Sequence, residues 1–264
     1  MQALTARVDL AAFLEHVAKA PQRVLMLDYD GTLAPFHEHP ERAVPYPEVV
    51  PVLEDITQAG GTRVVIVSGR PADEVPALLC LTVQPEIWGS HGWERLLPDG
   101  TRVVEQASAA AQAALAAAVS AIADMLQDGA RLERKLASVA LHWRGLPARL
   151  AEDVRHRADS AWRPIAAGGA VEILLFDGGV ELRCVGCNKQ SAVKAVLSET
   201  PPDSAVAYLG DDVTDEDAFR AVKLRGLGVL VRPELRATEA DVWLKPPHEL
   251  LAFLRRWSVR KQNA

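Results

Sequence analysis

Two aspartates stand two residues apart at the end of an apolar run near the amino terminus. Residues 24–28 (VLMLD) predict a short buried strand, and Asp28 and Asp30 follow at its tip. Gly31 permits a sharp turn that would hold both carboxylates near one point. Such carboxylates can act as a nucleophile or a proton carrier. Turn and helix-cap aspartates are also common at strand ends, so the pair alone leaves both interpretations open.

Two further motifs could bind a phosphate group. Ser68 ends the predicted strand 63–68 (RVVIVS), and its hydroxyl and the following amide of Gly69 could donate to a phosphate oxygen, with Arg70 close by. Lys189 opens a predicted helix and could contact both a phosphate and a carboxylate. An ordinary loop and a solvated surface lysine are the alternatives, so these motifs gain weight only together.

A third strand end carries three acids, Asp211, Asp212 and Asp215. The helix dipole favours an acid at a helix start by about 0.3–1 kcal/mol, but three exceed what capping requires. Two unit charges about 4 Å apart repel by roughly 4 kcal/mol at an effective dielectric near 20. Convergence of Asp28, Asp30 and Asp211 would therefore require a cation. Oxygen ligands without paired His or Cys favour Mg²⁺ over zinc.

These motifs need a scaffold, and short aliphatic runs alternating with helical patterns predict an α/β fold with a parallel sheet. The predicted strands are residues 24–28, 63–68, 86–89, 205–210 and 228–231, and the predicted helices are residues 47–59, 71–79, 189–198, 215–225 and 249–257. Open α/β sheets bind ligands at the carboxyl ends of their strands, where the acids lie.

The spacing of the motifs leaves room for an inserted domain. Between Asp30 and Ser68 there are 37 residues, enough for a helix and a strand, whereas 120 residues separate Ser68 from Lys189. That interval contains an alanine-rich segment, residues 108–126, in which Leu115, Val119, Ile122 and Leu126 recur at helical spacing. We expect a helix there, although a low-complexity linker is the alternative. A second helix at residues 146–161 and strands at 170–176 and 180–184, joined by an Asp177-Gly178-Gly179 turn, predict an inserted α+β domain.

In order along the chain, DYDGTLAPF, SGR, the lysine of CNKQSAVKAV and GDDVTDEDAF resemble the four motifs of haloacid dehalogenase superfamily phosphatases. The resemblance implies a Rossmann-like core and a Mg²⁺ cofactor. It makes Asp28 the nucleophile and Asp30 the general acid and base. Ser68, Gly69 and Lys189 would hold the phosphate.

The same resemblance implies a set of metal ligands. Asp28 and Asp211 would bind Mg²⁺ through their carboxylates, and Asp212 and Asp215 would support the site. Asp30 should be protonated when substrate is bound, so we expect it to bind the metal through its backbone carbonyl. The carboxylates and lysine are all present.

Finer similarity points to one family within the superfamily. The segments GSHGWE (89–94), ERKLASVALHWR (133–144), VELRCVGCNK (180–189) and YLGDDVTDEDAF look like trehalose-6-phosphate phosphatases. This implies an α+β cap at residues 104–186, between core parts at 1–103 and 187–264. It also implies hydrolysis of trehalose 6-phosphate to trehalose and phosphate in trehalose biosynthesis, with functional coupling to a trehalose-6-phosphate synthase. The residues implied in substrate binding are Arg70, His91, Glu94, Glu133, Lys135, Arg144 and Glu181. Ion pairs on the surface, or a buried histidine in the case of His91, are the structural alternatives.

Two positions depart from the family pattern. Cys184 stands where the family often has proline, and Gln190 replaces the glycine that usually follows the motif lysine. We expect the Gln190 side chain near the phosphate pocket, where it could shift substrate preference. A related sugar or cyclitol phosphate phosphatase therefore remains an alternative. A catalytically silent subunit of a trehalose-synthesising complex is a further alternative, against which the intact carboxylates count.

Composition sets outer bounds on function. The net charge of −6 and the pI near 5.7 argue against a basic surface for nucleic acid or an anionic membrane. The first twenty residues predict an amphipathic helix rather than a secretory signal, and no later run is long enough to span a membrane. Cys80, Cys184 and Cys187 are too few for a disulfide framework, and the single C-x-x-C pair cannot complete a zinc site. We expect a cytoplasmic protein.

Overall fold

The computed structural model describes residues 1–37, 39–176 and 178–258. The chain divides into two compact units. The core unit comprises Met1–Val104 and the chain from Asn188 onward, and the cap unit comprises Glu105–Cys187. The boundaries expected from the sequence, 103/104 and 186/187, lie one residue away from these. Among the described residues, no helix is both long and apolar enough to cross a membrane.

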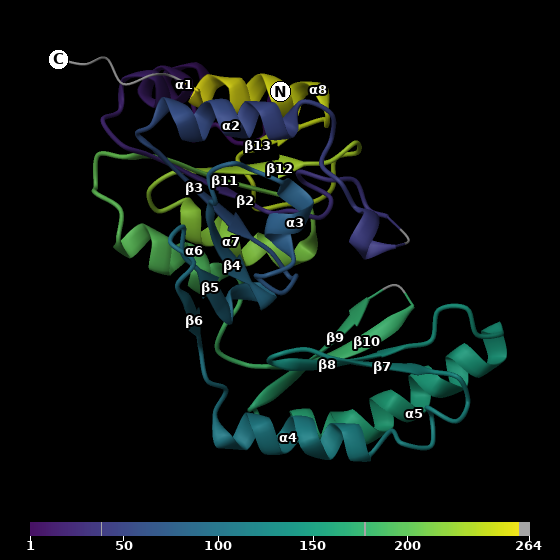
Figure 1. The fold of residues 1–264 in the computed structure, drawn as a ribbon. Helices are drawn as coiled ribbons and strands as arrows, with labels where there is room; N and C mark the ends of the chain where they lie inside the picture. Colours follow the sequence, from purple (N-terminus) through teal and green to yellow (C-terminus); the bar gives the residue numbers. More distant parts are fainter. Residues whose placement is uncertain (38, 177, 259–264) are drawn as a thin grey trace. The chain divides into compact units, whose positions relative to one another are not determined.

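The core unit contains a sheet that is parallel in its middle (Figure 1). The described strands follow one another across it in the order β1 (Gln2–Ala3), β13 (Val242–Leu244), β12 (Leu227–Val231), β11 (Ala205–Gly210), β2 (Arg23–Leu27), β3 (Thr62–Val67), β4 (Glu86–Gly89), β5 (Glu94–Leu96) and β6 (Arg102–Val104). Strands from β13 to β4 are parallel, and β1, β5 and β6 pair antiparallel at the two edges. The loops after β12, β11, β2, β3 and β4 therefore meet at one carboxyl edge.

Helices cover both faces of this sheet (Figure 1). One face carries α1 (Leu10–Lys19), α2 (Val49–Ala59) and α8 (His248–Leu254), and the other carries α6 (Lys189–Ser198) and α7 (Glu216–Val222). Shorter elements are α3 (Val75–Leu79), η1 (Pro40–Arg42), η2 (Ser90–Gly92), η3 (Val213–Asp215) and η4 (Arg255–Trp257). Along β2, Leu25 packs with the first group and Met26 with the second. Burial on both faces explains why the central strands are apolar runs without alternation.

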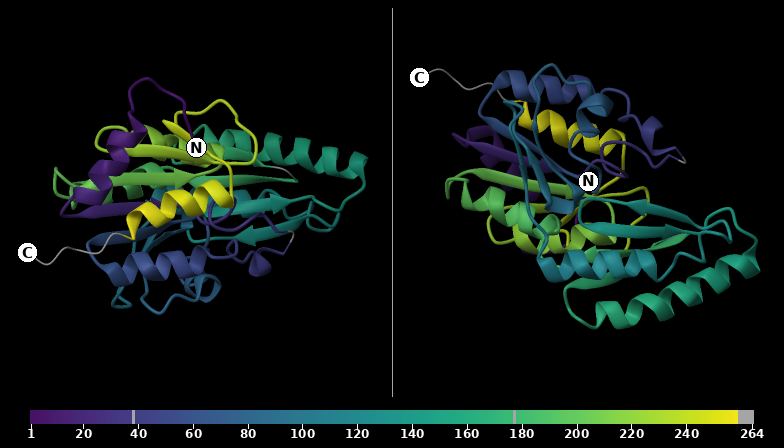
Figure 2. Two further views of the ribbon diagram at one scale, coloured as in Figure 1. Left: turned by 90° about the horizontal axis from the view of Figure 1, so that it is seen from above. Right: turned by 60° about the horizontal axis from the view of Figure 1, so that its bottom comes forward.

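The cap unit is an antiparallel sheet with two helices (Figure 2). Its described strands lie in the order β7 (Arg131–Arg134), β8 (Ser138–His142), β10 (Gly179–Cys184) and β9 (Val171–Phe176). The helices are α4 (Ala109–Ser120) and α5 (Ala148–Ala166). The buried Trp162 indole donates to the carbonyl of Ala118 at 3.0 Å and so ties α5 to α4.

The predicted α/β class and parallel sheet are confirmed, but the sequence missed several elements. Six short strands were not predicted: β1, β5, β6, β7, β8 and β13. The alanine-rich helix ends at Ser120 instead of residue 126, and Leu126 is exposed. Helix α5 begins two residues later than predicted and continues through Pro164 to Ala166. In the predicted turn, Asp177 lies outside the described residues, while Gly179 pairs with Phe176 across β10 and β9.

Candidate active site

The first predicted motif forms a buried turn directly after β2. Asp28 is 4% exposed, and its amide donates to the carbonyl of Leu209 at 2.9 Å. Gly31 has a φ of +81°, and a Cβ atom there would lie 2.1 Å from Oδ2 of Asp211. A side chain at residue 31 would displace the Asp211 carboxylate. The glycine is therefore what brings the acid after β11 against the turn after β2.

Lys189 lies between two carboxylates at the start of α6. The side chains of Asn188 and Ser191 form a capping box that fixes this helix end. The Lys189 Nζ donates to Oδ1 of Asp28 at 2.7 Å and to Oδ1 of Asp215 at 2.8 Å. Burial by itself lowers the pKa of Lys189, but Asp215 and Asp28 together raise it well above its usual value. The lysine is therefore a permanent positive charge beside the predicted nucleophile.

Asp215 has both of its oxygens occupied by donors. Oδ1 accepts from Lys189 and from the Tyr208 hydroxyl, while Oδ2 accepts from the amides of Asp211 and Asp212 at 3.0 and 2.9 Å. Although one oxygen each of Asp28, Asp211 and Asp215 lie within 4.8 Å of one another, four donors saturate Asp215. We infer that Asp215 orients Lys189 and the Asp211 backbone. Asp212 is exposed, and its amide is part of the same set of contacts to Asp215.

Asp28 and Asp211 carry the charge that this cluster does not compensate. Burial raises the pKa of Asp28 to about 7, against the opposing effect of Lys189. Burial, followed by the charges of Asp28 and Asp215, raises the pKa of Asp211 to about 9. Oδ1 of Asp211 is buried without a hydrogen-bond partner. When all three carboxylates are ionised they face one ammonium, which leaves an excess of two negative charges. These residues fit a divalent cation with oxygen ligands.

Among the described residues, two arginines contact the backbone of Asp211. Arg232 and Arg236 donate to the backbone carbonyl of Asp211 at 3.2 and 3.4 Å. Arg236 also pairs with Glu216 at the start of α7. These guanidinium groups orient the peptide after β11 and place positive charge near it. The carboxylate of Asp211 lies against Gly31.

The loop after β3 carries the second motif and is tied to the turn after β4. The amide of Arg70 donates to Oγ of Ser68 at 3.1 Å, which leaves the hydroxyl hydrogen for another acceptor. The amides of Ser90 and His91 donate to the carbonyls of Arg70 and Ser68 at 2.7 and 2.9 Å. A Cβ atom at Gly69 would lie 2.7 Å from the His91 ring. The His91 imidazole thus packs against the loop predicted to hold phosphate.

Arg70 and Glu94 both form ion pairs inside the core unit, and their contacts with substrate stay a prediction. Arg70 forms a two-pronged ion pair with Asp30, at 2.7 Å from Nε and 2.6 Å from a terminal nitrogen. Glu94 is 2% exposed and accepts from the Ser90 hydroxyl and from Arg102. A buried carboxylate with both oxygens bonded has a structural role in this conformation.

The two positions that depart from the family pattern have contacts of their own. The Gln190 amide donates to the carbonyl of Asp217 at 3.4 Å, and its oxygen accepts from Lys194 at 3.1 Å. Gln190 therefore links α6 to α7, and its effect on substrate preference stays a prediction. Cys184 is buried at the end of β10.

Three of the four predicted sugar-binding residues of the cap unit lie together on its sheet. Glu133 and Glu181 both pair in register with Ala140, so the two carboxylates share a face. The Lys135 Nζ lies 3.3 Å from Glu181 and 3.9 Å from Glu133. Arg144 follows β8 and lies close to Gly178. The geometry thus brings Glu133, Lys135 and Glu181 together.

Comparison with known proteins decides the family. The family model described as trehalose-phosphatase matches residues 26–241. The chain belongs to the trehalose-phosphatase family. A trehalose-phosphate phosphatase of Mycobacterium marinum is 33% identical over 251 residues, which cover 89% of this chain and 61% of that protein. The chain thus spans about three fifths of the length of the curated relative.

Solved structures show the fold that this family shares. The C-terminal domain of a Candida albicans trehalose-6-phosphate phosphatase superposes with a TM-score of 0.79 at 20% identity, covering 98% of this chain and 100% of that one. A haloacid dehalogenase-like hydrolase from Bacteroides thetaiotaomicron superposes with a TM-score of 0.64 at 16% identity, covering 89% and 99%. The predicted Rossmann-like core of the haloacid dehalogenase type is confirmed.

Sequence reasoning missed several partners in this member of the trehalose-phosphatase family. His142 lies 2.8 Å from Glu133 and lowers the pKa of that carboxyl, and the Ser138 hydroxyl donates to Glu181 at 2.6 Å. Tyr208 donates to Asp215 from inside β11. The contacts of Ser138 with Glu181 and of His142 with Glu133 depend on how the strands align, and the spacing of motifs along the sequence does not give that alignment. Tyr208 lies within an apolar strand, where nothing in the local sequence indicates that its hydroxyl contacts Asp215.

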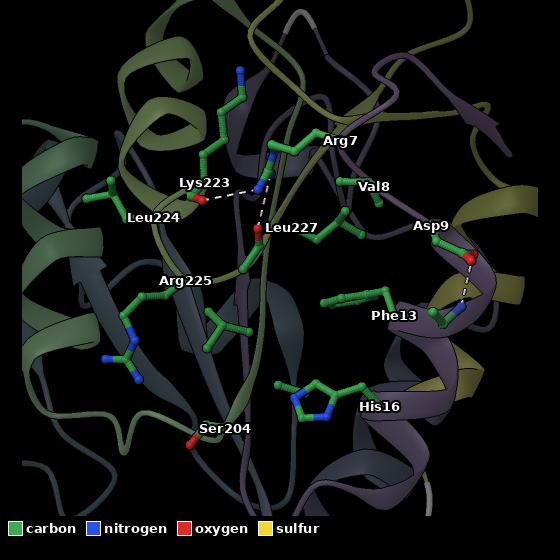
Figure 3. A pocket seen from close by; sticks show the side chains of 14 residues that line it. Arg7, Val8, Asp9, Phe13, His16, Ser204, Lys223, Leu224, Arg225 and Leu227 are labelled. Carbon is green, nitrogen blue, oxygen red and sulfur yellow. Dashed lines mark hydrogen bonds between the residues drawn. The ribbon is translucent and has the colours of Figure 1, made fainter.

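The opposite edge of the core sheet carries a hollow of about 360 Å³, well separated from the trehalose-phosphatase motifs (Figure 3). It is lined by the amino ends of β11 and β12, the end of α7 and the start of α1. Its charged groups already have partners. Arg7 pairs with Asp241 at 2.7 Å, and Lys223 pairs with Glu239 at 2.9 Å. Arg225 donates to the carbonyl of Leu197 at 2.7 Å. These contacts stabilise the fold around the hollow.

Proposed function

We propose that this protein hydrolyses trehalose 6-phosphate to trehalose and phosphate through a phosphorylated intermediate on Asp28. The observation that supports this most is the buried ion pair of Asp28 with Lys189, beside the unpartnered oxygen of Asp211. A nucleophilic carboxylate next to a fixed ammonium can approach an anionic phosphoryl group that would otherwise repel it. Family membership gives the same assignment by position.

The proposed reaction has two displacements. A carboxylate oxygen of Asp28 attacks phosphorus, the bond from phosphorus to the sugar oxygen breaks, and Asp30 gives its proton to that oxygen. Water then attacks phosphorus, the bond to Asp28 breaks, and the proton of the water returns to Asp30. Phosphate monoester hydrolysis is among the slowest uncatalysed reactions. Two displacements with proton transfer by Asp30 each have a lower barrier than the single uncatalysed step.

We propose that Mg²⁺ is held by the carboxylates of Asp28 and Asp211 and by the backbone carbonyl of Asp30. The buried oxygen of Asp211 without a partner and the excess negative charge fit this ion. When bound, Mg²⁺ supplies positive charge that offsets the oxygens of the transferring group. Asp215 holds the backbone at Asp211 in place by accepting from the amides of Asp211 and Asp212.

We propose that Ser68, Gly69 and Lys189 hold the phosphoryl oxygens. The Ser68 hydroxyl retains its hydrogen for donation because its oxygen accepts from Arg70. His91 packs against Gly69 and so supports this loop. In place of the direct substrate contacts expected for His91 and Glu94, we propose that both residues fix the turn after β4.

We assign sugar recognition to Glu133, Lys135, Arg144 and Glu181 of the cap unit. Sugar hydroxyls both donate and accept, and a carboxylate–ammonium cluster offers partners of both kinds. Lys135 between Glu133 and Glu181 provides such a set. A synthase that forms trehalose 6-phosphate would be the functional partner under this proposal.

The test is a panel of phosphate-release assays with Mg²⁺ and with chelator. The panel contains trehalose 6-phosphate, sucrose phosphate, glucosyl-phosphoglycerate, an amino-cyclitol phosphate and p-nitrophenyl phosphate. Preference for trehalose 6-phosphate, abolished by chelator, is expected. Preference for another member would assign the chain to a related phosphatase, and lack of release from all of them would favour a catalytically silent subunit.

A further inference from the structure

Arg70 contacts the predicted general acid and base, Asp30, through two hydrogen bonds, but the proposed reaction gives Arg70 no role. Its guanidinium, in a side chain 9% exposed, donates to both oxygens of Asp30 at 2.7 and 2.6 Å. A terminal nitrogen also donates to the carbonyl of Pro40 at 2.8 Å, and the guanidinium carbon lies 5.4 Å from the centre of the Tyr29 ring. Three partners therefore fix the plane of the guanidinium, and that plane fixes the carboxylate of Asp30.

The backbone of Arg70 is held as firmly as its side chain. Its amide donates to Ser68, and its carbonyl accepts from the amide of Ser90 at 2.7 Å. Ser90 and His91 have φ values of 49° and 58°, a left-handed conformation that is strained for residues other than glycine. Glu94 accepts from the Ser90 hydroxyl and helps to hold this turn. Such strain persists where the surroundings hold the turn, and this turn fixes the backbone of Arg70, whose side chain contacts Asp30.

The two-pronged contact fixes both the direction and the plane of the Asp30 carboxyl group. Nε and a terminal nitrogen of Arg70 each donate to a different oxygen of Asp30, so the carboxyl group cannot rotate while both contacts are in place. A general base must lie within hydrogen-bond reach of the proton it takes, so this orientation decides whether Asp30 can act on water in the second displacement.

We propose that Arg70 is a positioning residue that holds Asp30 for hydrolysis of the phosphorylated intermediate. The inference rests on the proposed function and replaces the expected contact between Arg70 and substrate. In this step the water oxygen bonds to phosphorus and the bond from phosphorus to Asp28 breaks. Asp28 regains its carboxylate, and the water proton goes to Asp30. Asp30 then carries the proton for the next leaving group.

The test uses p-nitrophenyl phosphate, whose leaving group needs no proton from Asp30. Arg70→Met removes the guanidinium and keeps an apolar stem. Arg95→Met is the matched control, because Arg95 also lies over an aromatic ring, Trp88, at 5.0 Å, while its ion pairs are with Glu86 at 2.8 Å and Glu199 instead of Asp30. In rapid mixing, we expect Arg70→Met to release a burst of about one p-nitrophenol per active site. Steady-state turnover should then be at least about tenfold slower than that of the unaltered protein.

Two further variants keep the inference falsifiable if Arg70→Met fails to fold. Arg70→Lys keeps the charge without the planar fork and should give the burst with a smaller loss of turnover. In a protein that already carries Asp30→Asn, adding Arg70→Met should lower steady-state turnover by less than about twofold, because the effect of Arg70 passes through Asp30. Arg95→Met should give no burst.

Other results would overturn the inference. A higher KM with unchanged kcat would make Arg70 a substrate contact. A lower kcat without a burst, or an equal loss in Arg95→Met, would make it a structural residue. If the unaltered protein hydrolyses no phosphate ester, the proposed function itself fails, and the inference fails with it.

Discussion

The two edges of the core sheet both gather charged residues, but they treat charge differently. At the carboxyl edge, Asp28, Asp211 and Asp215 are all buried and face the single ammonium of Lys189. At the amino edge, the hollow of Figure 3 is lined by Arg7, Lys223 and other charged groups that have partners.

The difference separates function from structure. Charges at the amino edge are half exposed or compensated, so they cost little and add little. The excess of buried carboxylates at the carboxyl edge is costly without a cation, and raised pKa values mark that cost. A fold retains such a cluster when its chemistry requires it. The following predictions test this contrast between the two edges.

The largest effect is expected for Asp28→Asn. The amide keeps the shape of the side chain but removes the nucleophile, so turnover of trehalose 6-phosphate should fall by at least about a hundredfold. Circular dichroism should show an intact fold. The control at the amino edge is Lys223→Met, which breaks an ion pair at 2.9 Å and should change turnover by less than about twofold. Residual activity above a few per cent in Asp28→Asn would remove the nucleophile assignment.

Asp211→Asn should lower activity and raise stability at the same time. Loss of a carboxylate ligand should weaken Mg²⁺ activation by about tenfold or more, measured by titrating turnover with Mg²⁺. In chelator, Asp211 must either carry an uncompensated buried charge or take up a proton on folding, so its replacement by Asn should raise the melting temperature relative to the unaltered protein. A lower melting temperature in chelator would show that the carboxylate stabilises the fold without a metal.

Lys135→Ala in the cap unit should separate sugar recognition from phosphate chemistry. We expect kcat/KM for trehalose 6-phosphate to fall by about tenfold, or about 1.4 kcal/mol of transition-state stabilisation. Hydrolysis of p-nitrophenyl phosphate, which has no sugar hydroxyls, should change much less. Equal losses on both substrates would assign Lys135 a role in the fold.

The metal-free protein should lose stability as pH rises. The pKa values of Asp28 and Asp211 are raised to about 7 and about 9 from an ordinary value of 3.8, so the folded state binds more protons than the unfolded state between these limits. Stability therefore falls from about pH 4 upward and levels off only above about pH 9. Melting temperature in chelator should drop by several degrees between pH 5 and pH 9. Mg²⁺ should reverse most of this drop, and a flat profile in chelator would contradict the raised pKa values.

The sequence predicted the meeting of the catalytic motifs because parallel strands place their carboxyl ends at one edge. Asp28, Ser68 and Asp211 each follow an apolar run that forms a central strand. Contacts made by long side chains were beyond it. The ion pair of Arg70 with Asp30 depends on the left-handed turn at Ser90, which no local pattern in GSHGWE requires.

The cap sheet was only half predicted for a related reason. Strand β7 has the sequence RLER and lies at an edge of its sheet, largely exposed, so it lacks the alternating apolar pattern of a strand. Strand β8 pairs antiparallel with β7 and was not predicted either. Without β7 and β8 the register that aligns Glu133 with Glu181 could not be inferred.

The most direct test of the central claim is a structure of the protein with Mg²⁺ and beryllium fluoride, whose trifluoride adduct stands in for a phosphoryl group on a carboxylate. We predict the adduct on Asp28, with Lys189 and Ser68 contacting its fluorine atoms and Mg²⁺ bound by Asp28 and Asp211. An adduct on another residue, or a metal bound without Asp28 and Asp211, would contradict the account.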